Sequence, residues 1–116
     1  MISQKHRFRG QRSIEYVYKK GRTARNGPFS IKVLPTKRED YRLAVVVSKK
    51  VSKSAVKRNR IRRRVFELFR KARAEHGRPI PCDIVITVHG EQPAVWPADK
   101  LAATFHELLA SAGIGA

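Results

Sequence analysis

A helical period dominates the middle of the chain. Apolar residues recur there at intervals of three and four positions, at Ile61, Val65, Leu68, Phe69 and Ala72. This spacing places them on one face of an α-helix with about 3.6 residues per turn. The pattern predicts a long helix over about residues 54–75, with either Ser52 or Ser54 as the residue that caps its start.

Shorter periodic stretches predict one helix near each end of the chain. The first is expected to begin after a cap at Ser13 and to stop at Gly21. Its apolar face comprises Ile14, Val17 and Tyr18. The last helix is expected over about residues 98–112, because four leucine and phenylalanine side chains share one face there. Residues 1–12 are basic and show no period, so they are expected to form a flexible arm.

Alternating and continuous apolar runs predict three strands. Residues 29–34 alternate between apolar and polar, so we expect a half-buried strand with Ser30 and Lys32 off its core face. A near-continuous apolar run marks the second strand over 41–48, and β-branched residues mark the third over 83–88. The short connection between the first two strands favours their pairing as antiparallel neighbours.

The predicted elements define a small α/β sandwich in a single domain of 116 residues. Their order is helix, two strands, helix, strand and helix. The basic segment 21–28 contains the turn residues of an Asn-Gly-Pro sequence and is expected to be a loop. The second strand, the long helix and the third strand form a βαβ unit, for which the general rule gives a right-handed crossover.

Positive charge is concentrated on the long helix and the residues before it. The stretch from Lys49 to Arg73 holds twelve lysines and arginines but one acid, Glu67, and the whole chain has a formal net charge of +17. Because so much like charge destabilises a helix, a polyanionic partner is favoured over an ordinary solvated face. The core-like periods and the lack of a membrane-spanning run favour nucleic acid over a membrane.

The sequence offers no clear catalytic or metal centre. The four histidines fall in separate predicted elements, at His6, His76, His89 and His106. The acids are scattered, and no cysteine and histidine cluster has zinc spacing. The single cysteine, Cys82, is expected to be a small core residue in a protein of a reducing compartment. The sequence therefore predicts a binding protein rather than a catalyst.

A compound motif around the start of the long helix resembles one family. Residues 48–51 (SKKV) end the second predicted strand, and residues 55–63 (AVKRNRIRR) open the helix. Together they resemble the bacterial ribonuclease P protein component and its RNR signature, most strongly over residues 42–73. The resemblance implies a fold like domain 2 of ribosomal protein S5, with four strands and, against the general rule, a left-handed βαβ crossover.

The resemblance also implies two RNA-binding surfaces. The first would bind the catalytic RNA of ribonuclease P, through Lys49, Lys50, Lys53, Lys57, Arg58, Asn59, Arg60, Arg62 and Arg63. The second would be a cleft between the first helix and the sheet that takes the single-stranded 5′ leader of precursor tRNA. Its residues would be Ile14, Tyr18, Ser30, Lys32, Val46 and Ser48.

The implied function is that of a protein cofactor in a cytoplasmic ribonucleoprotein, with no DNA or membrane partner. The RNA subunit would cut the precursor, using Mg²⁺ held mainly by RNA. Ile14 and Lys32 stand where aromatic residues are common in the family, and Phe66 where an arginine is usual. Stacking on leader bases is therefore expected mainly from Tyr18, unless Tyr18 is a core residue. Composition alone equally suits a ribosomal or other structural RNA-binding protein, whereas an independent nuclease is disfavoured.

Overall fold

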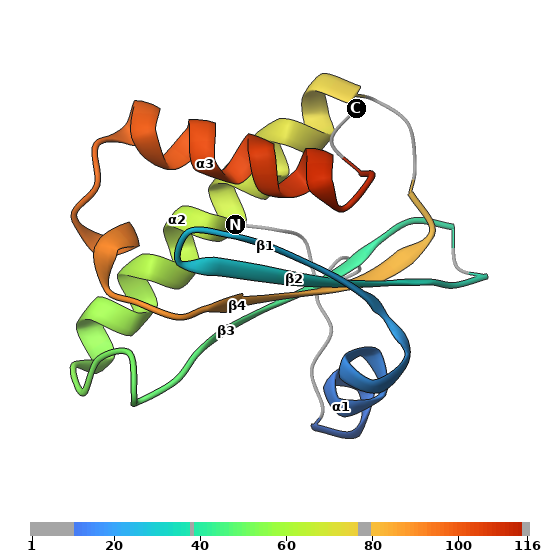
Figure 1. Cartoon of the computed structure of the whole chain (residues 1–116), viewed down its shortest axis with the longest axis horizontal. Coiled ribbons are helices and arrows are strands. Elements are labelled where there is room, and N and C mark those ends of the chain that lie inside the picture. The colour runs from blue at the N-terminus through green and yellow to red at the C-terminus, as the bar shows by residue number, and fades with distance from the viewer. Residues whose placement is uncertain (1–10, 38, 77–79, 115–116) are drawn as a thin grey trace.

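Three helices and a four-stranded sheet make up the fold (Figure 1). The computed structural model describes residues 11–37, 39–76 and 80–114. The helices are α1 (Gln11–Lys20), α2 (Ala55–His76) and α3 (Ala98–Ser111), with a short 3-10 turn, η2 (Gln92–Ala94), before α3. The strands are β1 (Arg22–Asn26), β2 (Phe29–Pro35), β3 (Arg42–Val47) and β4 (Cys82–Val88).

Strand β4 occupies a central place in the sheet, whose order is β1-β2-β4-β3. It pairs antiparallel with β2 and parallel with β3. The predicted antiparallel pairing of β2 with β3 is therefore wrong, because β4 lies between them. Burial agrees with this order: six of the seven β4 residues are buried, with Ile84 and Val85 fully covered on opposite faces, as is typical of a strand in the middle of a sheet.

Strand β1 is the fourth strand, and it replaces the loop predicted over 21–28. It pairs antiparallel with β2 through a two-residue turn at Gly27 and Pro28, and the φ of +57° at Gly27 suits a hairpin of this kind. The sequence shows no apolar pattern over β1 because it is an edge strand, on which Ala24 is the one side chain that packs against the core. The predicted βαβ unit is confirmed as β3, α2 and β4; the hand of its crossover stays a prediction.

The main core lies between the sheet and helices α2 and α3, which share one face (Figure 1). Alternate residues of β2, β3 and β4 point into it, among them Phe29, Leu43 and Ile84. The predicted apolar face of α2 meets them: Ile61, Val65 and Phe69 are fully buried. Cys82 is also in this core, and burial raises the pKa of its thiol to about 11, which makes it an inert packing residue.

Helix α1 lies alone on the opposite face of the sheet (Figure 1). Val17 is buried there with Ala44 and Val85. The helix already includes Gln11, so Ser13 is within it and cannot be its cap; that prediction is wrong. Most of the predicted arm lies outside the described residues. Among the described residues, Ser30 and Thr87 are half-buried on this face and His89 is exposed beyond the end of β4.

Candidate RNA interface

Two serines fix the start of α2. The Ser54 hydroxyl accepts a hydrogen bond from the Lys57 backbone N–H at 3.2 Å, which is the geometry of an N-cap. The buried Ser52 hydroxyl accepts one from the Ser54 N–H at 3.2 Å. Of the two predicted caps, Ser54 is therefore the cap itself, while Ser52 holds the loop that leads into it.

The basic loop is tied to the helix by Arg58. Its guanidinium donates to the Ser52 carbonyl at 2.9 Å, and the side chain is half-buried. Arg58 therefore supports the loop, and its remaining N–H groups are those available to a phosphate. One turn along, Arg62 donates to the Asn59 amide oxygen, which holds these two side chains together on one flank of α2.

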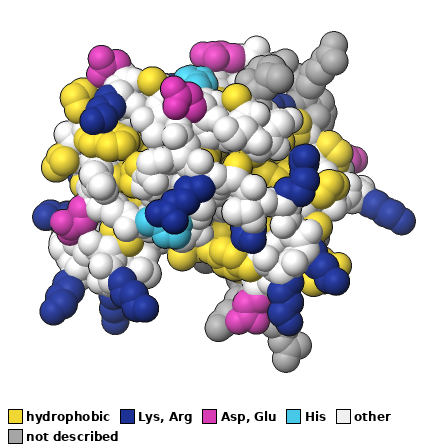
Figure 2. Space-filling model, in the orientation of Figure 1, with side chains coloured by type: hydrophobic (Ala, Val, Ile, Leu, Met, Phe, Trp, Pro, Cys, Tyr) yellow, Lys and Arg dark blue, Asp and Glu magenta, His cyan; other side chains and the backbone are white. Residues whose placement is uncertain are grey.

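The other residues predicted to bind the catalytic RNA are exposed. They are Lys49, Lys50, Lys53, Lys57, Asn59, Arg60 and Arg63. Figure 2 shows Lys and Arg side chains projecting around the end of the molecule where the β3–α2 loop lies. The first turn of α2 adds backbone N–H groups and the positive end of the helix dipole. Together these groups make a surface suited to phosphates.

Several basic side chains of α2 also make contacts within the protein. Arg64 donates to the carbonyls of Pro93 and Trp96, at 2.7 and 2.9 Å, and so holds η2 against α2. Arg70 pairs with Glu67 at 2.9 Å, and its hydrogen bonds lower the pKa of Glu67 to about 2. Arg58 and Arg62 join them, through their bonds to the Ser52 carbonyl and to Asn59.

Phe66 packs against the core, although it stands where the family usually has an arginine. Its side chain is half-buried on the flank of α2 that also carries Arg62. The ring therefore extends the hydrophobic core outward at this point, and the helix lacks one cation there relative to the family pattern.

The residues predicted to line the leader cleft share the α1 face of the sheet. Ile14, Tyr18 and Val46 pack around the small cluster of Val17, Ala44 and Val85. Strand register places Ser30 beside Thr87, and Thr87 beside Val46, in one row across the sheet. Lys32 lies in the next row, beside Val85, and Ser48 is exposed just beyond β3.

Three further residues belong to this surface and were missed from the sequence. Thr87 is hydrogen-bonded to the Tyr18 hydroxyl, so Tyr18 is anchored at its tip and half-buried rather than wholly within the core. The Ser30 hydroxyl lies 2.8 Å from Nε2 of His89. Arg25 pairs with Ser30 in register and so shares its face. The alternation of residues along β4 indicates Thr87 and His89, whereas Arg25 lies on a strand that the sequence predicts to be a loop.

The pKa of His89 offers a test of this arrangement. Burial lowers it below the ordinary value of 6.5, and the charge of Arg25 lowers it further. Any stability that this shift contributes is complete above pH 6.5 and is lost as the pH falls through the folded-state pKa. We expect Arg25→Gln to raise the His89 pKa part of the way toward 6.5 in an NMR titration.

Arg22→Gln is the matched control, because Arg22 is on the same strand but bonds to the Ala112 carbonyl of α3. The His89 pKa should not change in that variant. An unchanged pKa in Arg25→Gln, or an equal rise in both variants, would contradict the placement of Arg25 on the cleft face.

The two candidate surfaces lie on opposite faces of the sheet. The α2 surface is on the side of the main core, and the cleft is on the side of α1 (Figure 1). The segment from Ser48 to Lys53 connects them, since it leaves the end of β3 and leads into α2.

The described residues gather no metal-binding cluster. Among residues 11–37, 39–76 and 80–114, no three His, Cys, Asp or Glu side chains are placed to hold a metal ion. His89 is on the cleft face, His106 is exposed on α3, and the other two histidine side chains lie outside the described part of the chain. No helix within that part is long and apolar enough to cross a membrane.

The fold and its charge define the class: a small α/β domain with a dense cationic helix, typical of proteins that bind RNA. A family model described as Ribonuclease P matches residues 2–112. The chain belongs to the ribonuclease P protein family, as its RNR motif predicted.

Relatives and solved structures agree with this assignment. The ribonuclease P protein component of Pseudanabaena sp. is 33% identical over 94 residues, which cover 80% of this chain and 81% of that protein. That of Synechococcus sp. is 36% identical over 80 residues, which cover 60% of this chain and 63% of that protein.

Two solved structures share the fold. The RNase P protein of Staphylococcus aureus matches with a TM-score of 0.81 at 23% identity, covering 96% of this chain and 98% of that one. The RNase P protein of Thermotoga maritima matches with a TM-score of 0.76 at 25% identity, covering 89% of this chain and 94% of that one. The predicted α/β fold of the family is thereby confirmed.

Proposed function

We propose that this chain is the protein component of ribonuclease P and acts by binding two RNAs at once. The α2 surface binds the catalytic RNA, and the cleft beside α1 binds the 5′ leader of precursor tRNA. The holoenzyme removes the leader, with the RNA subunit performing the cleavage. The observation that supports this best is the placement of the two surfaces on opposite faces of one sheet, joined by the basic segment 48–53.

The contribution of the chain is electrostatic and positional. Its cations reduce the repulsion between the phosphates of the two RNAs. Mg²⁺ is held by RNA in this proposal, because the described side chains gather no ligand set for it. The ion would supply charge stabilisation at the scissile phosphate when bound. The cytoplasmic location is part of the same proposal.

A binding competition tests the proposal against a structural RNA-binding role. The chain should bind a bacterial ribonuclease P RNA far more tightly than a ribosomal RNA fragment of equal length at the same salt concentration. Salt must be held fixed because phosphate contacts make every affinity salt-dependent. Equal affinity for the two RNAs would favour the ribosomal or general RNA-binding alternative.

The cleft predicts a leader-dependent effect of Tyr18. Its ring is half-buried at the open part of the α1 face, beside the row of Ser30, Thr87 and Val46. Stacking of a base on an aromatic ring is worth about 1–3 kcal/mol. Tyr18→Ala should therefore weaken the binding of precursor tRNA to the holoenzyme about tenfold or more, while affinity for mature tRNA changes little.

Precursors of graded leader length provide the measurement, and Tyr18→Phe provides the control. The phenylalanine keeps the ring but loses the bond to Thr87, which is worth roughly 0.5–1.5 kcal/mol to folding. It should therefore lower stability slightly and leave leader binding nearly intact. Equal weakening of leaderless and leader-bearing substrates by Tyr18→Ala would show that Tyr18 serves only the core.

A further inference from the structure

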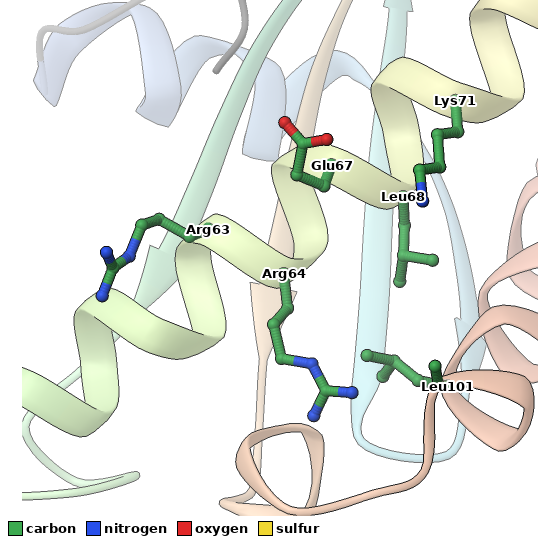
Figure 3. A pocket seen from close by; sticks show the side chains of 7 residues that line it. Arg63, Arg64, Glu67, Leu68, Lys71 and Leu101 are labelled. Carbon is green, nitrogen blue, oxygen red and sulfur yellow. The ribbon is translucent and has the colours of Figure 1, made fainter.

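A hollow between α2 and α3 borders the predicted RNA surface of α2 but lies mostly outside it. It has a volume of about 270 Å³ and is lined by Arg63, Arg64, Glu67, Leu68, Lys71, Ala98 and Leu101. Only Arg63 of these residues belongs to the RNA contacts expected from the family motif. Figure 3 shows Arg64 and Leu101 side by side, with Lys71 extending along Leu68.

The hollow combines an apolar floor with a cationic rim. Leu68 and Leu101 provide the floor, with Ala98 exposed at its edge, and Leu101 is itself buried. Arg63 and Lys71 are exposed at the rim. A ligand that fits must therefore present an apolar face to the floor and negative charge to the rim.

Arg64 gives the hollow a fixed planar wall. Its guanidinium donates to the carbonyls of Pro93 and Trp96, at 2.7 and 2.9 Å, so its orientation is set before any ligand arrives. A guanidinium plane is a surface on which nucleic-acid bases stack. Because the plane is already fixed, a base that stacks on it would cause little further loss of side-chain freedom.

The acid in the lining is turned away from the hollow. Figure 3 shows the Glu67 carboxylate on the other side of α2 from Leu68. It pairs with Arg70 at 2.9 Å and is ionised at neutral pH, since its pKa is lowered to about 2. The potential at the rim is therefore governed by Arg63 and Lys71 rather than by Glu67.

We propose that this hollow receives one unpaired nucleotide of the catalytic RNA, with its base against Arg64 and Leu101 and its phosphate at Arg63 and Lys71. The proposal rests on the proposed function, because it extends the same α2 surface onto the flank that faces α3. It adds a site that recognises an unstacked base, whereas the first turn of α2 offers contacts to phosphates alone.

The chemistry of the hollow favours an unpaired nucleotide over a duplex. A duplex keeps its bases stacked and would bring only phosphates to the rim, which would leave the apolar floor exposed. An unpaired base can place its ring on the floor while its phosphate stays at the surface. The volume, just under the roughly 300 Å³ at which drug-sized pockets begin, suits a single nucleotide.

A filling variant tests occupancy without changing charge. Ala98 is exposed at the start of α3, so Ala98→Phe should fold while its ring takes up the hollow. We expect its affinity for the catalytic RNA to fall about five- to a hundredfold, the loss of one stacked base. The slope of log affinity against log salt should change little, because Arg63 and Lys71 remain at the rim to bind the phosphate while the base is displaced. Ala103→Phe, on the exposed side of α3, should bind like the unmodified chain.

Lys71→Gln tests the rim separately. It should flatten the salt dependence by about 0.7–0.9, the effect of one phosphate contact. Lys37→Gln removes the same charge from an exposed position outside the hollow and should leave the slope nearly unchanged. Equal slopes for the two variants would overturn the assignment of a phosphate to Lys71.

Crosslinking identifies what enters the hollow. A photoreactive group attached to the cysteine of Ala98→Cys should crosslink to a few nucleotides that are unpaired in the catalytic RNA. The same group attached in Ala103→Cys should not. The native Cys82 is buried and will not be labelled. Crosslinks to duplex segments or to the leader would overturn the proposal. Equal binding of the catalytic RNA by Ala98→Phe and Ala103→Phe would also overturn the proposal for the hollow, but it would not affect the proposed function. Failure of the unmodified chain to bind the catalytic RNA would instead remove the proposed function itself.

Discussion

Replacing Arg60, Arg62 and Arg63 together with alanine should weaken binding of the catalytic RNA about a hundredfold or more. Each hydrogen bond to a charged group contributes roughly 1.5–3 kcal/mol, so the removal of only two such bonds reaches this size. Arg60 and Arg63 are exposed, and Arg62 bonds to Asn59 on the surface of α2. None of the three is in the core, so the fold should be retained.

The measurement is a binding titration at several salt concentrations. The slope of log affinity against log salt should fall by about 0.9 for each phosphate that the variant no longer binds, if the bound RNA is duplex. A variant with Lys19, Lys20 and Lys37 changed to alanine removes the same charge from exposed positions away from α2. If both triple variants lose affinity equally, net charge alone drives binding and α2 is not a specific interface.

Phe69→Ala should lower the free energy of unfolding by about 3–5 kcal/mol. Phe69 is fully buried where α2, α3 and the sheet meet. Its ring makes edge-to-face contacts with Tyr41 and Phe105, with ring centroids 4.9 and 6.4 Å away. Because a domain has only about 5–15 kcal/mol of stability, this one change should bring the chain close to unfolding.

Urea denaturation of the free protein measures this loss, with Phe66→Ala as the control. Phe66 is on the same helix but only half-buried at the margin of the core. Its removal should therefore lower the unfolding free energy by clearly less. Equal losses in the two variants would mean that the centre of the core does not lie at Phe69.

The helices were predictable because each carries a complete apolar face. The five apolar residues of α2 recur at helical spacing, and four of them, Ile61, Val65, Phe69 and Ala72, are buried in the core. Strand β1 was not predictable in this way, since its stability comes from pairing with β2 rather than from an apolar pattern. The order of the strands in the sheet was not predictable either. The short connection between β2 and β3 suggested that they pair, but β4, which is buried on both faces, lies between them.

The sequence indicated the cationic surface as a whole but could not distinguish the tasks of its members. Arg64 and Arg58 look like their neighbours in the sequence, yet they bind backbone carbonyls near η2 and in the loop before α2. Those acceptors come into place only in the folded chain. Likewise, the residues of the cleft face follow from strand register, which sets Ser30 beside Thr87 and Arg25 beside Ser30.

The most direct test of whether this chain is a cofactor of a catalytic RNA is the single-turnover cleavage of precursor tRNA. Three samples are compared at the same low Mg²⁺ concentration. The samples contain this chain alone, a bacterial ribonuclease P RNA alone, and the two together. We predict no cleavage by the chain alone, slow cleavage by the RNA alone, and much faster cleavage by the mixture. The Arg60, Arg62 and Arg63 triple variant should lose most of that gain. Cleavage by the chain alone, or a mixture no faster than the RNA alone, would contradict the role of a protein cofactor.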